Sequence, residues 1–520
     1  MLLQMINSLS PSRLALLVLI TWLAWRAAPY LLVKSPLDNI PGPKPTSYWK
    51  GNLPQIFAKD AFEYHKSIGE AYGSVVRITG LFGQRILYVI DPTAMHNIVI
   101  KDQNKYQPPR WLTEIVKLGF GPGLLAVYGE THRKQRKMLN PVFSVNHLRH
   151  MSPTFYNIAH KLRDAIAVQV KQSPKDVDML RWVGRTALEV IGQGGLGYSF
   201  DPLVENKPNP YGDAMKNFLP TVFRYPMFRM FVQYARYFGS ASFHRRLVEL
   251  VPLPLVQKLK DTIDTMQYRS VEIFKLKKQA LVAGNEVAAE ELAEGKDIIS
   301  VLLRENMEVA EQDKLPEEEL LGQMATLVFA ATDTMSATLS QILSLLSEHE
   351  EVQEKLRQEI LDSKQGTEDI PYDALMDRLP YLDAICRETL RLYPPITVSN
   401  REAVEDTILP LSKPIIGLDG KRISEIPIPK GTGFLAVTNA KVPAVYSNVM
   451  TFLGGGRACI GFKYAQLEMK IVLSVLLESF KFTPAECAKD IRWNLAGVKY
   501  PSVGNVDIPS LPIKVELLSR

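Results

Sequence analysis

The sequence predicts a mainly α-helical protein with small peripheral β-sheets, an α+β fold around one large core. Three observations predict this class. Most of the chain from Thr93 to Asp362 follows a helical period, punctuated by proline and glycine. Short β-like pieces lie at Gly73–Pro92, where a glycine turn joins two strands, and between Ile396 and Thr432. Apolar residues make up 46% of the 520 residues, which is enough for a large core.

The cysteines and the net charge narrow the class of protein. Cys386, Cys459 and Cys487 are the only three cysteines, too few for a disulfide framework, and their odd number indicates a reducing compartment. The net charge of +6 would suit an acidic protein partner or an anionic membrane face. It is too small to indicate nucleic acid, so we expect no nucleic-acid partner.

Residues 1–35 predict a single membrane-spanning anchor. Leu14–Trp25 is an apolar run, and after Arg26 apolar residues continue to Val33. Together they reach about the ~20 residues that a bilayer requires, with Arg26 snorkelling near one end. A cleaved secretory signal is the alternative, because the uninterrupted core is short. Cations are more numerous after the run, which predicts a body that faces the cytosol. These are Arg26, Lys34, Lys44 and Lys50, against Arg13 before the run.

The rest of the chain is expected to form a linker and one domain. Residues 36–50 include NIPGPKP, Asn39–Pro45, and predict a stiff proline-rich linker that holds the body off the membrane. No second linker is found, so residues 51–520 are expected to form one domain. Near its end Leu467–Phe480 predicts a helix, and the tail from Asn494 predicts loops and strands.

The stretch Phe218–Phe238 is dense in aromatic residues, with arginines between them. One interpretation is a helix that turns an apolar face to the core. The other is an element that dips into a membrane at the mouth of a hydrophobic channel. The sequence leaves both open.

FLGGGRACIG, Phe452–Gly461, places one cysteine in a glycine loop. The glycines allow a close approach of the backbone, and Arg457 offers donors to a carboxylate. A helix is expected directly after Cys459, and the amides at its start would favour a thiolate. A thiolate beside a cation suits an axial haem ligand, because the arginine can hold the haem propionates. A nucleophilic cysteine would need a base, and none can be identified.

The loop resembles the haem-binding signature F-x-x-G-x-R-x-C-x-G of the cytochrome P450 monooxygenases. The matching residues are Phe452, Gly455, Arg457, Cys459 and Gly461. The resemblance extends over nearly the whole chain and is strongest to the fungal microsomal branch. It implies the cytochrome P450 fold behind an N-terminal anchor, haem b (iron protoporphyrin IX) as cofactor, and Cys459 as the axial ligand of the iron.

RETLRLYPP resembles the family's E-x-x-R at Glu388 and Arg391. One helical turn separates the two residues, which suits an internal ion pair. EKLR, Glu354–Arg357, fits the same short pattern, and only the following LYPP and the distance to Cys459 favour the later copy. The resemblance gives the pair a structural role on the cysteine side of the haem.

FAATDTMSA resembles the family's distal helix, with Asp333 and Thr334 as an acid–alcohol pair. Such a pair relays protons to dioxygen so that the O–O bond breaks heterolytically. Ala331 replaces the family's usual glycine, and Met335 replaces a second hydroxyl, so Thr334 would carry the hydroxyl role alone. Without the other motifs, an ordinary Asp–Thr on a buried helix would be the better interpretation.

His132 and Arg136 stand one helical turn apart where the family has W-x-x-x-R, which contacts the haem propionates. Histidine can donate a hydrogen bond as tryptophan does. The alternative is a solvated basic helix face, whose remaining cations Arg133, Lys134 and Lys137 could dock an acidic reductase. Arg401 is a weaker candidate for a propionate.

One family segment is absent. Between Ala440 and Phe452 the family normally has a few dozen more residues, a meander with an aromatic-x-Pro-x-Arg motif whose arginine joins the E-x-x-R pair. Loss of one partner of a buried charge network costs on the order of 3–5 kcal/mol. The chain is therefore either the product of an incorrectly joined gene model or an altered haem protein.

These features together predict a monooxygenase. It would use O2 and electrons from NADPH through NADPH–cytochrome P450 reductase to oxidise a hydrophobic small molecule, such as a terpenoid, steroid or polycyclic aromatic, in secondary metabolism or xenobiotic oxidation. We expect a single pass through the endoplasmic reticulum membrane, contact with lipid, and a catalytic domain in the cytosol. Two alternatives stay open: a non-catalytic haem-binding protein, and a haem-thiolate isomerase or dehydratase that needs no reductase.

Overall fold

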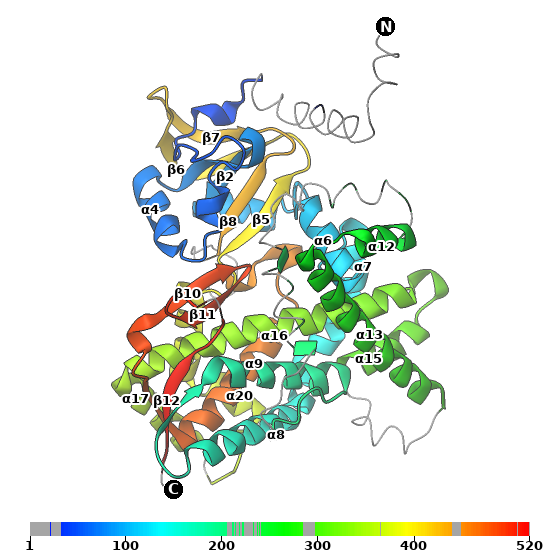
Figure 1. The fold of residues 1–520 in the computed structure, drawn as a ribbon, viewed down its shortest axis with the longest axis vertical. Coiled ribbons are helices and arrows are strands. Elements are labelled where there is room, and N and C mark those ends of the chain that lie inside the picture. Colours follow the sequence, from blue (N-terminus) through cyan, green and yellow to red (C-terminus); the bar gives the residue numbers. More distant parts are fainter. Residues whose placement is uncertain are drawn as a thin grey trace. The chain divides into compact units, whose positions relative to one another are not determined.

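The structure, a computed structural model, divides the chain into two compact units (Figure 1). The first unit is Met1–Gln107 with Val398–Pro443, and the second is Pro108–Thr397 with Ala444–Arg520. The residues described are 21, 33–204, 211, 212, 214, 218, 221, 222, 232, 234, 237, 239, 241–283, 297–364, 366–438, 449–506 and 508–518. The predicted boundaries after residues 35 and 50, and the single domain over 51–520, stay predictions.

The first unit is built on a five-stranded sheet with the order β1-β2-β8-β5-β3. Its strands are β1 (Val75–Thr79), β2 (Arg85–Val89), β3 (Tyr106–Gln107), β5 (Val398–Ala403) and β8 (Gly433–Val437). β2 and β8 are parallel and the other neighbours are antiparallel. A separate hairpin is formed by β6 (Thr407–Ile416) and β7 (Arg422–Ile428). Strands were predicted in both regions of the sequence, and this is confirmed.

Short helices surround this sheet. They are η1 (Pro36–Asn39), α3 (Leu53–Ile56), α4 (Phe62–Tyr72), η2 (Leu81–Gly83), α5 (Pro92–His96) and η3 (Asn97–Lys101). Ser35 caps η1, and Arg85 makes a bidentate contact with Asp38 at 2.6 and 2.9 Å. Leu37 and Ile40 are each only 1% exposed. The start of the predicted linker therefore packs on the first unit and does not stand clear of it.

The second unit is mainly helical. Its helices are α6 (Arg110–Phe120), α7 (Gly129–Leu139), η4 (Asn140–Phe143), α8 (Val145–Val170), α9 (Met179–Val190), η5 (Ile191–Leu196), α12 (Ala241–Leu250), α13 (Pro254–Ala283), α15 (Ile298–Glu308), η7 (Glu311–Asp313), α16 (Glu317–Glu348), α17 (Glu350–Lys364), α18 (Tyr372–Asp377), α19 (Pro380–Leu392), η9 (Met450–Phe452), η10 (Gly455–Arg457), α20 (Phe462–Ser479) and η11 (Ala488–Asp490). The helical texture expected up to Asp362 is confirmed for the described residues. One continuous apolar core joins α8, α9, α16 and α20.

α16 runs through the middle of the second unit (Figure 1). Pro316 precedes it, and three glutamates in its first turn, Glu317–Glu319, complement the positive end of the helix dipole. Gly322 lets the loop before α7 approach closely, because a Cβ added at Gly322 would lie 2.6 Å from the Gly123 amide nitrogen. Gln323 Oε1 accepts from the Leu124 amide at 3.0 Å and fixes this loop on α16.

Two small sheets complete the second unit. β12 (Pro512–Leu517) pairs with β4 (Lys175–Asp178) and β9 (Phe480–Pro484), so the C-terminal strand ties two distant segments together. β10 (Ile491–Ala496) and β11 (Val498–Val503) form a hairpin. The strands predicted in the tail are confirmed.

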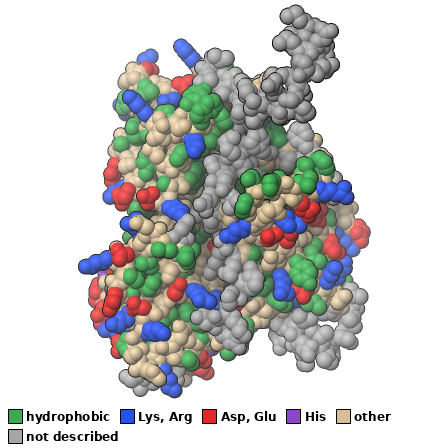
Figure 2. All heavy atoms as spheres, viewed as in Figure 1, with side chains coloured by type: hydrophobic (Ala, Val, Ile, Leu, Met, Phe, Trp, Pro, Cys, Tyr) green, Lys and Arg blue, Asp and Glu red, His purple; other side chains and the backbone are tan. Residues whose placement is uncertain are grey.

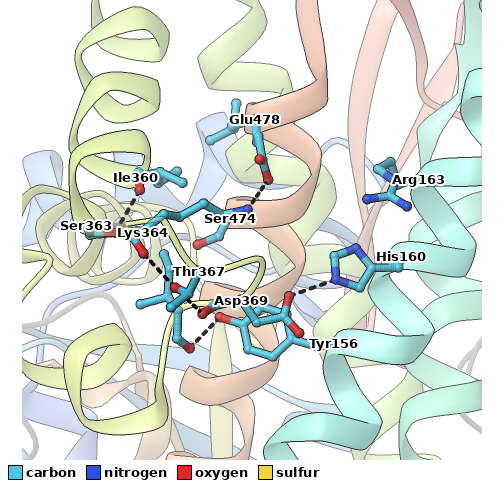
Figure 3. Close-up of polar contacts among 12 residues, drawn as sticks. Tyr156, His160, Arg163, Ile360, Ser363, Lys364, Thr367, Asp369, Ser474 and Glu478 are labelled. Atoms are coloured by element: carbon cyan, nitrogen blue, oxygen red, sulfur yellow. Dashed lines mark hydrogen bonds and ion pairs between the residues drawn. The ribbon is translucent and has the colours of Figure 1, made fainter. Parts of the chain in front are cut away.

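The loop between α17 and α18 is held by a polar cluster (Figure 3). His160 Nε2 lies 2.8 Å from Asp369 Oδ1, and the Tyr156 hydroxyl donates to the Ile370 carbonyl at 3.0 Å. Lys364 pairs with Glu478 at 2.6 Å. The nearby hydroxyl of Ser474 donates to the Lys470 carbonyl and not to His160. The His160–Asp369 pair therefore activates no serine here, and its role is to hold the loop.

Two predictions about membranes concern residues that are mostly outside the description. The predicted anchor, residues 1–35, lies almost wholly outside it, and among the described residues no helix is long and apolar enough to cross a bilayer. Of the aromatic stretch Phe218–Phe238 only six residues are described. Phe218, Val222 and Val232 among them are buried, as the core-facing interpretation expects.

The described surface carries both signs of charge. Figure 2 shows Lys and Arg interspersed with Asp and Glu over the face in view. This distribution agrees with the small net charge of +6.

Candidate functional site

The cysteine loop is a compact turn that ends at the start of α20. The Cys459 amide donates to the Phe452 carbonyl at 2.8 Å and closes the loop. Gly455 has a φ of 64°, which glycine adopts without strain. Gly461 precedes α20, and its carbonyl accepts from the Ala465 amide at 2.8 Å. The predicted helix directly after the cysteine is confirmed, and it begins five residues earlier than Leu467.

The Cys459 thiol belongs to the second unit and lies just before α20. Its side chain is exposed, yet surrounding protein atoms raise the pKa of the thiol through burial. The Gly461 amide and the Arg136 guanidinium lower the pKa of the thiol, but they do not outweigh burial. The expected preference for a free thiolate is therefore wrong, because the desolvation of the sulfur exceeds the effect of the helix start. Iron would have to displace the proton.

A cluster of basic side chains lies beside the cysteine. Arg136 Nη1 donates to the Ala458 carbonyl at 2.6 Å, and Arg457 Nη2 donates to the Val127 carbonyl at 2.6 Å. His132 is 9% exposed and completes the cluster. Among the described residues, no carboxylate bonds to either guanidinium.

The electrostatics of this cluster favour an anionic partner. Burial, and then the repulsion of Arg136, lower the pKa of Arg457 to about 10. Burial lowers the pKa of His132 to about 4, with smaller contributions from Arg457 and Arg136. The histidine is therefore neutral at pH 7 and can donate one hydrogen bond. Two half-buried cations that repel each other leave a place for negative charge.

The middle of α16 carries the acid–alcohol pair. Ala330 is exposed and Asp333 and Thr334 are half-buried, although most residues on either side along the helix are buried. The Thr334 hydroxyl donates to the Ala330 carbonyl at 2.7 Å. This is the bond that an ordinary helical threonine makes, so the resting geometry alone does not indicate catalysis.

The Glu388–Arg391 ion pair forms on α19, and Arg391 Nε lies 2.8 Å from Glu388 Oε2. The side chains are 56% and 26% exposed. The expectation of an internal pair is therefore wrong for this chain. In the competing tetrad, Arg357 is the buried arginine, and it donates to the carbonyls of Leu477 and Phe480 at 2.7 and 2.9 Å.

Arg401 belongs to the first unit, so the structure does not place it relative to Cys459. It lies buried on β5, where its Nη1 donates to Ser399 Oγ at 2.7 Å and to the Asn400 carbonyl at 2.8 Å. Its expected contact with a propionate stays a prediction.

Two partners of the site escape sequence reasoning. The carbonyls of Val127 and Leu124 hold Arg457, at 2.6 and 3.4 Å. Backbone carbonyls occur in every residue and give no signal of their own. The nearest signal is the run of glycines before them, which marks a loop in close contact with α16.

The residues present fit haem. An exposed thiol offers the iron ligand, the basic cluster offers donors for two carboxylates, and the half-buried Asp333 and Thr334 of α16 offer an acid and a hydroxyl. In the described part of the chain no histidine bonds to Cys459, so a nucleophilic thiol would have no bonded base.

Comparison with known proteins supports this assignment. A family model described as cytochrome P450 matches residues 41–411 and 434–502. Cytochrome P450 monooxygenase 91 of Postia placenta is 48% identical, with 97% of this chain and 98% of the relative covered. Ganoderic acid synthetase CYP5150L8 of Ganoderma lucidum is 41% identical, with 96% and 97% covered. A crystal structure titled as a cytochrome P450, CYP102L1, shares the fold with a TM-score of 0.67 at 19% identity, with 92% of this chain and all of that chain covered.

The relatives carry residues that this chain lacks. The comparison with the Postia placenta monooxygenase 91 runs over 535 positions but includes 97% of 520 residues, or about 504, so about 31 positions have no counterpart here. This number agrees with the few dozen residues whose absence the sequence indicates after Ala440. Residues 439–448, where the gap was predicted, lie outside the described residues.

With most of its length matched by the family model and by fungal relatives, the chain belongs to the cytochrome P450 family and is a monooxygenase of that family.

Proposed function

We propose that the protein is a membrane-anchored haem-thiolate monooxygenase that oxidises a hydrophobic small molecule. Haem b would be held by Cys459, and electrons would come from NADPH through NADPH–cytochrome P450 reductase. The anchor would place the protein in the endoplasmic reticulum with its catalytic part in the cytosol. The apolar sequence between Leu14 and Val33 supports the anchor.

Bound haem supplies the activation of dioxygen and the transfer of one oxygen atom to the substrate. Cys459 would provide the sulfur ligand, as a thiolate. The Gly461 amide, which bonds to the sulfur, would then stabilise the thiolate. Arg136 and Arg457 would hold the two propionates, and the neutral His132 would donate a further hydrogen bond.

Asp333 and Thr334 would deliver protons from α16. The Thr334 hydroxyl can donate toward the distal side only after it leaves the Ala330 carbonyl, to which it donates at 2.7 Å. Asp333 would then restore the proton. A Thr334→Ala variant should therefore oxidise its substrate more slowly and release more peroxide, whereas insensitivity to this change would favour an isomerase or dehydratase.

Several observations bear on the partners. The expected reductase surface on α7 is smaller than its sequence indicates, because Lys134 donates to the carbonyls of Gln312 and Lys314 and Arg133 pairs with Glu130. Lys137 stays exposed and is our candidate for reductase docking. A terpenoid, steroid or polycyclic aromatic is our candidate substrate. The name of the Ganoderma lucidum relative, a ganoderic acid synthetase, supports a biosynthetic role.

The single observation that carries the proposal is the exposed Cys459 beside two guanidiniums that bond to no carboxylate among the described residues. The test is the reduced carbon-monoxide difference spectrum of the full chain. A strongly red-shifted Soret band is expected, and Cys459→Ala should abolish it. Cys487→Ser, which changes a partly exposed cysteine elsewhere, should keep the band. The same band in Cys459→Ala would end the proposal.

A non-catalytic haem protein is the second candidate. The about 31 positions missing relative to the Postia placenta protein favour it, as does the exposure of the Glu388–Arg391 pair. Stoichiometric haem without substrate-dependent consumption of NADPH would support this candidate. NADPH consumption that responds to a hydrophobic substrate would exclude it.

A further inference from the structure

Lys499 is a buried lysine in a position that the proposed function does not use. It lies on the β10–β11 hairpin, whose turn is made at Gly497 with a φ of 84°. Leu495 stands opposite Lys499 in the hairpin, so Trp493, two residues along, lies on the same face. Only 7% of Lys499 is exposed.

The Lys499 ammonium sits in a cage drawn from three segments. Its Nζ donates to Oε1 of Gln341 on α16 at 2.8 Å. It lies 4.6 Å from the centre of the Trp493 ring and 4.9 Å from the centre of the Tyr393 ring, just after α19. A backbone hydrogen bond also joins the hairpin to the segment after α19, because the Lys499 amide donates to the Pro395 carbonyl at 2.8 Å.

Within the described ranges, the contacts of this ammonium contain no carboxylate. α16 contributes a neutral amide, the end of α19 contributes Tyr393 as the only titratable side chain, and the hairpin contributes an indole. Burial lowers the pKa of Lys499 to about 8, and no charged side chain among the described residues adds to that effect. The faces of the two aromatic rings attract a cation and act in the opposite direction.

We propose that Lys499 is a positioning residue whose ammonium, caged by Trp493 and Tyr393 and bonded to Gln341, holds the β10–β11 hairpin against α16 and the end of α19. The consequence for the reaction rests on the proposed function. Gln341 lies two turns after Thr334 on α16, so the clamp fixes the hairpin relative to the helix that would deliver protons. The clamp itself needs neither haem nor substrate.

Two physical effects predict opposite changes in the stability of the β10–β11 hairpin when the charge of Lys499 is removed. If the cage stabilises the cation, the uncharged isostere Lys499→Met loses the attraction of both rings and frees the hairpin. If the cost of burying an unpaired charge dominates, the same change removes that cost and tightens the hairpin. The response of the hairpin amides therefore decides between them.

The experiment measures hydrogen exchange of residues 491–503 in the full chain. Lys499→Met should exchange at least about 10-fold faster in the hairpin, and Lys499→Arg should stay within about 3-fold of the wild type, because a guanidinium also binds to ring faces. Lys481→Met is the matched control. It removes a lysine that pairs with Glu350 on the surface and should leave the hairpin unchanged.

A second measurement is needed because the larger side chain of Lys499→Arg could disturb the hairpin for steric reasons. The emission of Trp493, taken as the wild-type spectrum minus that of Trp493→Phe, should change in Lys499→Met because the cation beside the indole is lost. It should be unchanged in Lys481→Met. Slower or unchanged exchange in Lys499→Met, with unchanged Trp493 emission, would overturn the clamp. Failure of haem binding would leave this result untouched, because neither readout uses haem.

Discussion

Leu453 holds a strained backbone conformation in the middle of the cysteine loop. Its φ of 55° and ψ of −166° belong to a region that glycine adopts and other residues avoid, at a cost on the order of 1–3 kcal/mol. The residue is followed by three glycines, Gly454–Gly456, so the strain is confined to one position. The loop therefore keeps one unfavourable residue where glycine would fit.

We predict that Leu453→Gly raises the free energy of unfolding by about 1 kcal/mol, because relief of strain exceeds the extra entropy of the unfolded glycine. Thermal unfolding of the full chain measures this change. Leu453→Ala is the control, since alanine keeps the Cβ and the strain and loses apolar contact. The explanation would be wrong if Leu453→Gly were the less stable of the two variants.

His132 should make the stability of the haem-free chain depend on pH. Burial lowers its pKa from 6.5 to about 4, so between these values the unfolded chain binds the proton and the folded chain does not. The contribution of the neutral His132 to the free energy of unfolding is fully present above pH 6.5 and is lost as the pH falls toward 4. The full loss is on the order of 3 kcal/mol.

The measurement compares urea unfolding of the wild type and His132→Asn from pH 7 to pH 4. The wild type should lose more stability than the variant across this range. Bound propionates would offset the neighbouring arginines, so the difference should shrink in haem-loaded protein. Parallel curves for the two haem-free proteins would contradict the role of burial at His132.

At the scale of single residues, the sequence is informative about which side chains meet and less informative about their protonation. Cys459, Arg457 and Arg136 were placed together from their motifs, and they lie together in the structure. The raised pKa of the Cys459 thiol could not be predicted, because it depends on desolvation by atoms that only the folded chain supplies.

At the scale of elements, the internal environment expected for the Glu388–Arg391 tetrad is absent, and the buried arginine belongs to the other copy of E-x-x-R. The arginine of the α17 copy, Arg357, is 8% exposed at its side chain and bonds to two carbonyls near the end of α20. The arginine of the α19 copy, Arg391, bonds to the half-exposed Glu388. A short tetrad fixes the spacing of the pair along a helix but not which face of the helix is covered.

Arg357→Ala should therefore cost on the order of 3 kcal/mol of unfolding free energy, because the carbonyls of Leu477 and Phe480 lose a charged donor in a buried site. Arg391→Ala should cost less than about 1 kcal/mol, as exposed ion pairs do. Chemical unfolding of both variants tests the order. Equal costs, or a larger cost for Arg391→Ala, would mean that α19 is covered in solution.

Regular elements were predictable where periodicity or turn residues were strong, as in the β1–β2 hairpin, the long helices and α20. The packing of Leu37 and Ile40 was not, because NIPGPKP has the composition of a linker and its burial comes from contacts with distant strands. The pairing of β12 with β4 was equally out of reach. Some 330 residues separate them, and local sequence carries no record of such a partner.

For the whole molecule, the sequence predicted the helical class and the haem-thiolate site, and both agree with the family that the comparisons show. It also predicted the absence of one segment. Its place after Ala440 stays a prediction, because the comparison with the Postia placenta protein gives the number of unmatched positions and not their location. A segment that covered Glu388 and Arg391 would turn a surface ion pair into a buried one.

Restoring the segment should therefore change the energetics of α19. When a family meander segment is inserted after Ala440, Arg391→Ala should cost on the order of 3–5 kcal/mol in place of less than about 1, because the arginine then leaves a buried carboxylate unpaired. Arg357→Ala, far along the chain from the insertion, should keep its cost and serves as the control.

The reduced carbon-monoxide difference spectrum is recorded on the same proteins. A stronger thiolate band in the restored chain would identify the present sequence as a shortened form of a working enzyme. If the restored chain gave the same band and the same small cost for Arg391→Ala, the missing residues would not be the cover of α19, and the shorter chain would be complete as a haem protein.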